Sequence, residues 1–213
     1  MDNWLEDIYS RIQKKVDFSS DLVKDSFPFV SVNGKYREYS GGEFSTSWWT
    51  NSFWPGLLWL MYRDTKKDKY KEYAISVEDK LDEAFKDYDG LHHDVGFMWS
   101  LSSVASYKLT GNEQSRRRAL LAASVLSSRY NLKGNYIRAW NGDHHGWAIV
   151  DCLMNLPLLY WASKQTDDPR FRDIAISHAD TALTSILRAD GSANHIIRFD
   201  MLSGEFVEVM NGQ

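Results

Sequence analysis

The segment FWPGLLWLMYRDTKKDKYKEY, residues 53–73, joins an apolar run to a charged run through a threonine. Nearly every side chain from Leu57 to Tyr62 is apolar, whereas the part that begins near Lys69 carries charges on one face of a helix. A helix that is apolar on all sides must be buried, and a helix with one charged face borders water. Asp64 and Thr65 mark a tight turn, so the segment predicts two antiparallel helices.

This pattern occurs three times along the chain. The other copies run from Phe97 through Thr110-Gly111-Asn112 to a helix near Glu113, and from Leu153 through Thr166 and Pro169 to a helix near Arg170. Because the first helix of each pair must be buried, we expect an inner ring of helices wrapped by an outer ring. The unequal spacing of the threonines argues against a tetratricopeptide-like solenoid, whose period is fixed at about 34 residues. The sequence therefore predicts an all-α fold, an α/α toroid of about three αα-hairpins.

Both ends of the chain add to these hairpins. An amphipathic helix is expected from about Asn3 to Val16, with Trp4, Leu5, Ile8 and Ile12 on one face. Turn-forming residues between positions 27 and 48 leave room for a short hairpin at most. Residues 194–207 alternate around a turn and predict a C-terminal β-hairpin. A length of 213 residues suits a single domain, 1–213, with a sizeable core.

Composition excludes several classes of protein. A net charge of −4 lacks the basic surplus that nucleic-acid binding requires, so we expect no nucleic-acid partner. No apolar stretch approaches the ~20 residues of a membrane span, and the N-terminus has no signal-peptide pattern. A single cysteine forms no internal disulfide, and we expect a cytoplasmic protein. The unusual feature is an aromatic content of 14%.

Chemistry-bearing residues gather just before the expected inner helices, whose N-termini share one rim of a toroid. The groups are Trp49 and Trp54 before the first helix, His92-His93-Asp94 before the second, and Trp140 to Trp147 before the third, with Asp151 on that helix. Aromatic faces stack on sugar rings, while carboxylates, amides and imidazoles bind hydroxyl groups. The rim therefore predicts a carbohydrate cleft.

Two carboxylates are the candidates for catalysis. Asp151 stands among Val150, Cys152 and Leu153, and burial among such residues raises the pKa of a carboxyl toward that of a general acid. Asp94 has two interpretations, as a helix N-cap and as a catalytic group, which are compatible with each other. A pair of carboxylates on neighbouring hairpins suits acid–base work on a glycosidic or related bond.

Metal and thiol chemistry are weighed against simpler interpretations. His92-His93 with Asp94, and Asp143 with His144-His145, contain ligand-type residues. Adjacent side chains in a helix or strand point apart, and the sequence has no histidines at i, i+4 and no cysteine pair, so we expect no metal and no cofactor. Cys152 has apolar neighbours and is interpreted as a small core residue rather than a nucleophile.

Three motifs together resemble one known family. Residues 49–59, His92 to Phe97, and residues 149–159 are similar to the unsaturated glucuronyl hydrolases, glycoside hydrolase family 88. The sister group, the unsaturated rhamnogalacturonyl hydrolases, fits His-His-Asp and Asn-Leu-Pro-Leu-Leu less well. The resemblance implies an (α/α)6 toroid that uses no metal.

The resemblance also implies a reaction and a set of site residues. The substrate would be a lyase-generated oligosaccharide, such as a glycosaminoglycan-type disaccharide, with a 4,5-unsaturated uronic acid at its non-reducing end. A carboxylic acid protonates C4 of the vinyl ether, water adds at C5, and the hemiketal opens to release the shortened sugar. Asp151 would be the acid/base and Asp94 would help to position the substrate. The expected substrate contacts are Trp49, Trp54, His93, Trp140, His195 and Gln213.

The chain departs from the family in length. Members are considerably longer, whereas this sequence holds about three hairpins instead of six. A half toroid would expose the flanks of helices that are apolar on all sides, so we expect a homodimer, or the N-terminal portion of a longer product. A non-catalytic sugar-binding toroid or inactive fragment is the alternative from another class, and a purely structural helical scaffold would leave the rim residues without a role.

Overall fold

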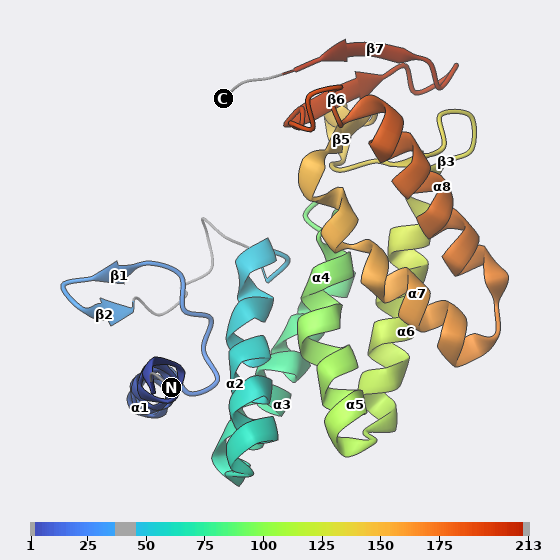
Figure 1. The fold of residues 1–213 in the computed structure, drawn as a ribbon. Coiled ribbons are helices and arrows are strands. Elements are labelled where there is room, and N and C mark those ends of the chain that lie inside the picture. The colour runs from blue at the N-terminus through green and yellow to red at the C-terminus, as the bar shows by residue number, and fades with distance from the viewer. Residues whose placement is uncertain (1–2, 37–45, 211–213) are drawn as a thin grey trace.

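A computed structural model describes residues 3–36 and 46–210 (Figure 1). Its three helical hairpins confirm the predicted repeat. They pair α2 (Phe53–Thr65) with α3 (Asp68–Leu81), α4 (Val95–Trp99) and α5 (Ala105–Thr110) with α6 (Glu113–Ser128), and α7 (Leu156–Thr166) with α8 (Pro169–Ser185). The first helices contact one another, α2 with α5 and α4 with α7, and each packs against its own second helix. The elements therefore form two layers of a partial α/α toroid.

The turns of the three hairpins share one local structure. Thr65, Thr110 and Thr166 each donate a side-chain hydrogen bond to the carbonyl four residues earlier, over 2.7, 2.7 and 2.9 Å. The residue after each threonine has a positive φ, and the backbone N–H one residue further donates to the threonine hydroxyl. Each threonine therefore ends its inner helix, and Asn112 and Asp168 are the side-chain N-caps of the outer helices.

The core lies between the two layers. Its largest fully buried side chains include Leu58, Trp59, Trp99 and Leu158 from the first helices and Tyr70, Leu81 and Leu126 from the second. The second of the three inner segments is continuous: a single π-helical turn, Ser100–Val104, joins α4 to α5. All five residues of α4 are buried, which confirms the prediction of an inner helix that is covered on every side.

The N-terminal helix differs from the prediction in length and in the face it buries. α1 spans Trp4–Val23, because no glycine or proline interrupts residues 17–23. Ser20 and Val23 are buried, whereas the predicted apolar face, including Trp4 at 64% and Ile12 at 50%, is exposed. The expected short hairpin is confirmed as β1 (Ser31–Val32) and β2 (Lys35–Tyr36).

A small sheet covers one end of the helical layers (Figure 1). The predicted C-terminal hairpin is confirmed as β6 (Ile196–Phe199) paired with β7 (Phe206–Val209). A third strand that the sequence did not indicate, β5 (Trp147–Ile149), pairs with β6. The sheet and the end of α8 enclose a second, smaller core that includes Tyr136, Ala148, Cys152, Ala182, Ile186 and Ile197. A further hairpin, β3 (Tyr130–Asn131) and β4 (Tyr136–Ile137), precedes β5.

The expectation that Asp151 lies on the third inner helix is wrong. After β5 the chain forms a 3₁₀ segment, Val150–Met154, and α7 begins only at Leu156. Pro157 in the first turn of α7 is the physical reason, because proline suits the start of a helix and disrupts its interior. Among the residues that the structure describes, no helix combines the length and the apolar character that crossing a membrane requires.

Candidate active site

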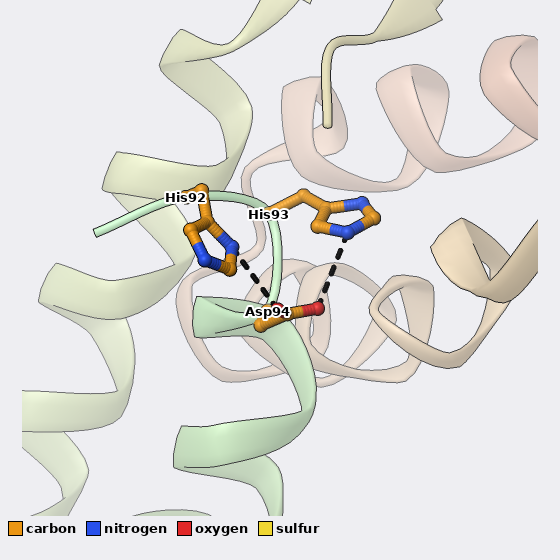
Figure 2. A group of neighbouring side chains, drawn as sticks. All are labelled: His92, His93 and Asp94. Carbon is orange, nitrogen blue, oxygen red and sulfur yellow. Dashed lines mark ion pairs between the residues drawn. The ribbon is translucent and has the colours of Figure 1, made fainter. Parts of the chain in front are cut away.

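Asp94 lies in the turn that leads into α4, between two histidines (Figure 2). It occupies the N-cap position, but its side chain makes no capping hydrogen bond. Its carboxylate oxygens lie 3.0 Å from Nδ1 of His92 and 3.2 Å from Nε2 of His93 instead. Asp94 therefore stands at the N-cap position, as predicted, but its carboxylate does not cap the helix. The carboxylate is directed at the imidazoles instead.

The two histidines keep Asp94 ionised. Burial of the carboxylate favours its neutral form, but the interactions with His92 and His93 outweigh burial and hold the pKa of Asp94 well below its usual range. A buried carboxylate of this kind is a fixed negative charge at neutral pH.

Asp151 reaches the same place from the 3₁₀ segment between β5 and α7. Its carboxylate lies 3.7 Å from Nε2 of His93. Desolvation raises the pKa of Asp151, the nearby charge of Asp94 raises it further, and His93 acts in the opposite direction. The side chain nevertheless remains 44% exposed, so a substrate can approach it.

His93 links the two carboxylates. The ring is buried, and its Nε2 atom is within 4 Å of both Asp94 and Asp151. The pKa values of the two carboxyls are displaced in opposite directions, downward for Asp94 and upward for Asp151. Such a division within one site is typical of an acid–base pair, in which one carboxyl stays ionised and the other can carry a proton.

A contact between α4 and the start of α7 sets the spacing of this pair. Asn155, four residues after Asp151, accepts a hydrogen bond of 2.9 Å through Oδ1 from the backbone N–H of Phe97. The helix backbone comes so close at Gly96 that an added Cβ would lie 2.3 Å from Cβ of Asn155. The two segments that carry the carboxylates are therefore packed directly against each other.

Aromatic side chains form two clusters near the acid–base pair. Trp49, which is 40% exposed, lies edge-on to Phe53 and Phe97, with ring centroids 5.8 and 6.1 Å away. In the second cluster, the ring centroid of Trp140 lies 5.7 Å from that of Trp147. Both clusters present rings of the type that stack on sugars.

Trp54 does not join these clusters. It is only 6% exposed, and its indole N–H donates a hydrogen bond of 2.8 Å to the carbonyl of Lys24. The side chain is part of the core between α1 and α2, because its position on α2 faces inward. Trp54 therefore has little surface to offer a sugar, and we leave it out of the site.

Buried Arg129 joins the segment that contains Trp140 to the turn that contains His92 and His93 through hydrogen bonds. Its guanidinium donates to the carbonyls of Leu91 and Ala139 and to the side chain of Asn141. The backbone N–H of His93 donates to the carbonyl of Ala139 over 3.1 Å. Trp140 and His93 are thereby held on adjoining stretches of backbone.

His195 lies on the side of the site formed by the sheet. Its carbonyl accepts a hydrogen bond of 2.9 Å from the backbone N–H of Val150, the residue before Asp151. Its side chain contributes to the electrostatic environment of Asp151. Gln213 lies outside the described residues. The structure thus brings together Asp94, Asp151, His93 and His195, with Trp49 and Trp140 on neighbouring segments.

His92, His93 and Asp94 could also hold a metal ion, since their ligand atoms lie within 4.8 Å of one another. The expectation that adjacent histidines point apart is wrong here, because His93 and Asp94 lie in a turn rather than in a helix or strand. Asp143, His144 and His145 do not form such a group within the described part of the chain.

Cys152 is buried, and the loss of solvent, with a smaller contribution from Asp151, raises the pKa of its thiol to about 12. The nucleophile would have to be the thiolate, so this environment favours the core interpretation of Cys152.

Comparison with known proteins shows the family of this chain. The sequence profile of Glycosyl Hydrolase Family 88 matches residues 22–190, a span that includes Asp94, Asp151 and His93. The chain belongs to glycosyl hydrolase family 88. It is 37% identical over 204 residues to the unsaturated chondroitin disaccharide hydrolase of Streptococcus pyogenes serotype M1, covering 94% of this chain and 50% of that protein. It is 40% identical over 189 residues to the unsaturated glucuronyl hydrolase of Bacillus sp. strain GL1, covering 86% and 49% of the two chains.

Solved structures of family 88 enzymes share the fold. The unsaturated glucuronyl hydrolase of Bacillus sp. GL1 matches with a TM-score of 0.84 at 35% identity, over 93% of this chain and 53% of that one. The enzyme of Streptococcus agalactiae matches with a TM-score of 0.86 at 30% identity, over 97% and 52%. These matches confirm the predicted toroid and the family resemblance. The chain spans about half the length of the relatives it matches.

Three residues of the site were missed by sequence reasoning. Asn155 stood within a quoted motif without a role. Arg129 carried no signal, because the carbonyls that it binds belong to irregular segments before and after it in the chain. His178 on α8, whose lowered pKa is due to burial and in smaller part to His93, could have been noticed from the sequence. It follows Phe171 and Ala175 at spacings of four and three, on the buried face of the helix.

Proposed function

We propose that this protein is an unsaturated glucuronyl hydrolase that removes a 4,5-unsaturated uronic acid from the non-reducing end of an oligosaccharide. The observation that carries the proposal is the pair of carboxyls around His93, one held ionised and the other with a raised pKa. Family membership and the names of the relatives, which act on unsaturated chondroitin or glucuronyl substrates, support it.

In the proposed reaction Asp151 is the acid and then the base. Its carboxyl proton goes to C4 of the double bond, and the positive charge that develops at C5 is shared with the ring oxygen. Water adds at C5 and gives a proton back to the Asp151 carboxylate. The hemiketal opens, the shortened sugar leaves from C1, and a keto-aldehyde uronate remains.

The other residues of the site bind and orient in this proposal. Asp94, ionised and held by two histidines, accepts hydrogen bonds from ring hydroxyls and stabilises positive charge next to the reacting carbons. Trp49 and Trp140 stack on the sugar rings, and His93 and His195 contribute polar contacts. Gln213 remains a predicted contact. A glycosaminoglycan-type disaccharide is the proposed substrate, with no metal or other cofactor.

The test follows the conjugated double bond by its ultraviolet absorbance. The chain is incubated with an unsaturated chondroitin disaccharide and, separately, with its saturated counterpart. We expect the absorbance to fall and the saturated sugar to survive, because hydration requires the double bond. Asp151→Asn removes the proton donor and is expected to lower the rate by 10²–10⁴-fold, the usual range for a general acid.

The Asp151→Asn variant should fold normally. The raised pKa of Asp151 means that the folded state disfavours its charged form, so a neutral amide at this position is expected to leave the melting temperature at neutral pH unchanged or higher. A folded variant that keeps the full rate would disprove the role of Asp151.

Two rival functions give different results in the same assay. A non-catalytic sugar-binding toroid, or an inactive half, binds the disaccharide in a calorimeter without loss of absorbance. An unsaturated rhamnogalacturonyl hydrolase consumes unsaturated galacturonyl-rhamnose disaccharides in preference to the chondroitin product.

A homodimer and a cytoplasmic location remain proposals. The partial ring, with open apolar flanks, supports the homodimer.

A further inference from the structure

A second buried histidine interacts with His93. His178 on α8 is 1% exposed, like His93 itself. Burial, with a smaller contribution from His93, lowers the pKa of His178 to about 4, so its ring is neutral at neutral pH. The proposed reaction does not use His178, yet the titratable group that helps to lower its pKa is His93, the imidazole that links the two carboxylates.

The proton of His178 can be placed from its hydrogen bond. Its Nδ1 atom accepts a bond of 2.9 Å from the backbone N–H of Ile137. A neutral imidazole that accepts at Nδ1 carries its proton on Nε2. This buried Nε2–H group has no acceptor among the described residues, and the buried Nδ1 atom of His93 has no partner there either. His178 therefore has a donor that lacks an acceptor, and His93 has a ring nitrogen that is available to accept.

The backbone brings these rings to one place. Ile137 holds His178 through its N–H group, and Ala139 accepts the backbone N–H of His93 over 3.1 Å. Two residues of chain span at most about 7 Å, so both histidines are anchored to neighbouring points of the same short segment. No direct hydrogen bond joins the two rings, so the donor on His178 and the acceptor on His93 would be matched through one buried water.

We propose that His178 is a positioning residue for the acid–base pair: its Nε2–H group donates through one buried water to Nδ1 of His93 and so keeps the proton of His93 on Nε2, between Asp94 and Asp151. In this tautomer His93 donates to the ionised Asp94 and remains neutral. The effect on catalysis by Asp151 rests on the proposed function, whereas the tautomer of His93 does not depend on it.

The consequence concerns the acidity of Asp151. A positive charge on His93 favours the carboxylate form of Asp151 and so opposes its use as an acid. With His178 donating to Nδ1, that atom cannot also take a proton, and His93 is kept uncharged. The other titratable groups around the pair are Asp94 and His92 on the same turn and His195 beside Asp151.

Two matched variants separate this role from simple packing. In His178→Asn the side-chain oxygen can replace Nδ1 as acceptor for Ile137, but no donor reaches His93. In His178→Gln the longer side chain carries an N–H group to the former place of Nε2. Thermal melting establishes that each variant is folded before it is used.

The decisive measurement is made on the full chain with ¹⁵N-labelled histidine. Long-range proton–nitrogen NMR spectra distinguish protonated from bare ring nitrogens. At neutral pH we expect a proton on Nε2 and none on Nδ1 of His93 in the wild type and in His178→Gln, and a proton on Nδ1 in His178→Asn. A wild-type His93 that carries its proton on Nδ1 overturns the proposal, as does a folded His178→Asn with unchanged His93 signals. If His178→Asn does not fold, the position of the His93 proton in the wild type and in His178→Gln decides whether the proposal holds.

A pH–rate profile tests the catalytic consequence. In His178→Asn the alkaline limb is expected to move by about one pH unit to lower pH, which is about a tenfold loss of rate beyond that limb. His178→Gln should lie closer to the wild type. An unmoved limb in an active His178→Asn variant overturns the link to Asp151. If the chain turns over no unsaturated disaccharide at all, the proposed function fails while the NMR result still decides the tautomer.

Discussion

The charge of Asp94 acts on Asp151 as well as on a substrate. Because this charge raises the pKa of Asp151, Asp94→Asn is expected to lower that pKa. A general acid must be protonated, so activity falls as pH rises through its pKa, and the alkaline limb of the pH–rate profile should move to lower pH in the variant. The measurement is the rate of absorbance loss on unsaturated disaccharide across the pH range, for wild type and variant.

Asp143→Asn is the matched control for this prediction. Asp143 is an exposed aspartate on the segment between Trp140 and β5, and it is not among the groups that shift the pKa of Asp151. Its variant should keep the wild-type profile. An Asp94→Asn profile whose alkaline limb stays in place, or moves to higher pH, contradicts the electrostatic coupling of the two carboxyls.

The sequence predicted both carboxylates, but its reason for Asp151 was only partly correct. It expected desolvation by neighbours on a buried helix, whereas Leu153 and Met154 are 44% and 65% exposed. Of its neighbours in sequence, Ile149 and Cys152 are buried, and Asp151 also meets His93 across the fold. That contact joins residues 58 positions apart, and no local pattern encodes it.

The packing of α4 against the start of α7 sets the distance between the carboxylates. In Gly96→Ala the new Cβ would lie 2.3 and 2.5 Å from Cβ and Cα of Asn155, so one segment must move. We expect a loss of about 1–3 kcal/mol in the free energy of unfolding, the usual cost of overpacking, together with a several-fold lower kcat. Chemical denaturation and steady-state kinetics measure the two effects.

Gly56→Ala on α2 is the control for Gly96→Ala. There the closest atom to an added Cβ is Cβ of Leu101, at 3.3 Å, so a shift of a few tenths of an ångström relieves the contact. Alanine also favours a helix over glycine, so this variant should be about as stable as the wild type. Equal effects of the two substitutions would show that close contact with Asn155 has no special role.

Prediction of the elements succeeded where the signal was local. The apolar runs and the turns around Thr65, Thr110 and Thr166 predicted three hairpins, because helical periodicity and capping depend on neighbours in sequence. β5 was missed because its three residues form a strand only by pairing with β6, more than 45 residues later. Asp151 lies in a 3₁₀ segment and not in a helix because Pro157 places the start of α7 at Leu156, and that signal was overlooked.

At the scale of the whole molecule, the partial ring has an apolar flank. Phe53, Leu57 and Leu60 on α2 are 46%, 45% and 48% exposed. Together with Leu101 and Leu109 they line a groove of about 340 Å³ between α2 and the segment that ends in α5. The length alone suggested one domain. The motifs indicated that the ring is partial, and the chain covers about half of the relatives in which the same fold is found.

The proposed homodimer makes a specific prediction for this flank. If a second copy covers α2, the wild-type chain should have the mass of a dimer in light scattering, because burying these leucines removes apolar surface from water. Leu57→Glu combined with Leu60→Glu would place two charges in that interface and should yield a monomer. Leu132→Glu is the control, since Leu132 is 85% exposed in the turn between β3 and β4, and it should leave the dimer intact. A wild-type chain that is monomeric at micromolar concentration, or a dimer that survives both charges on α2, excludes this face as the site of self-association.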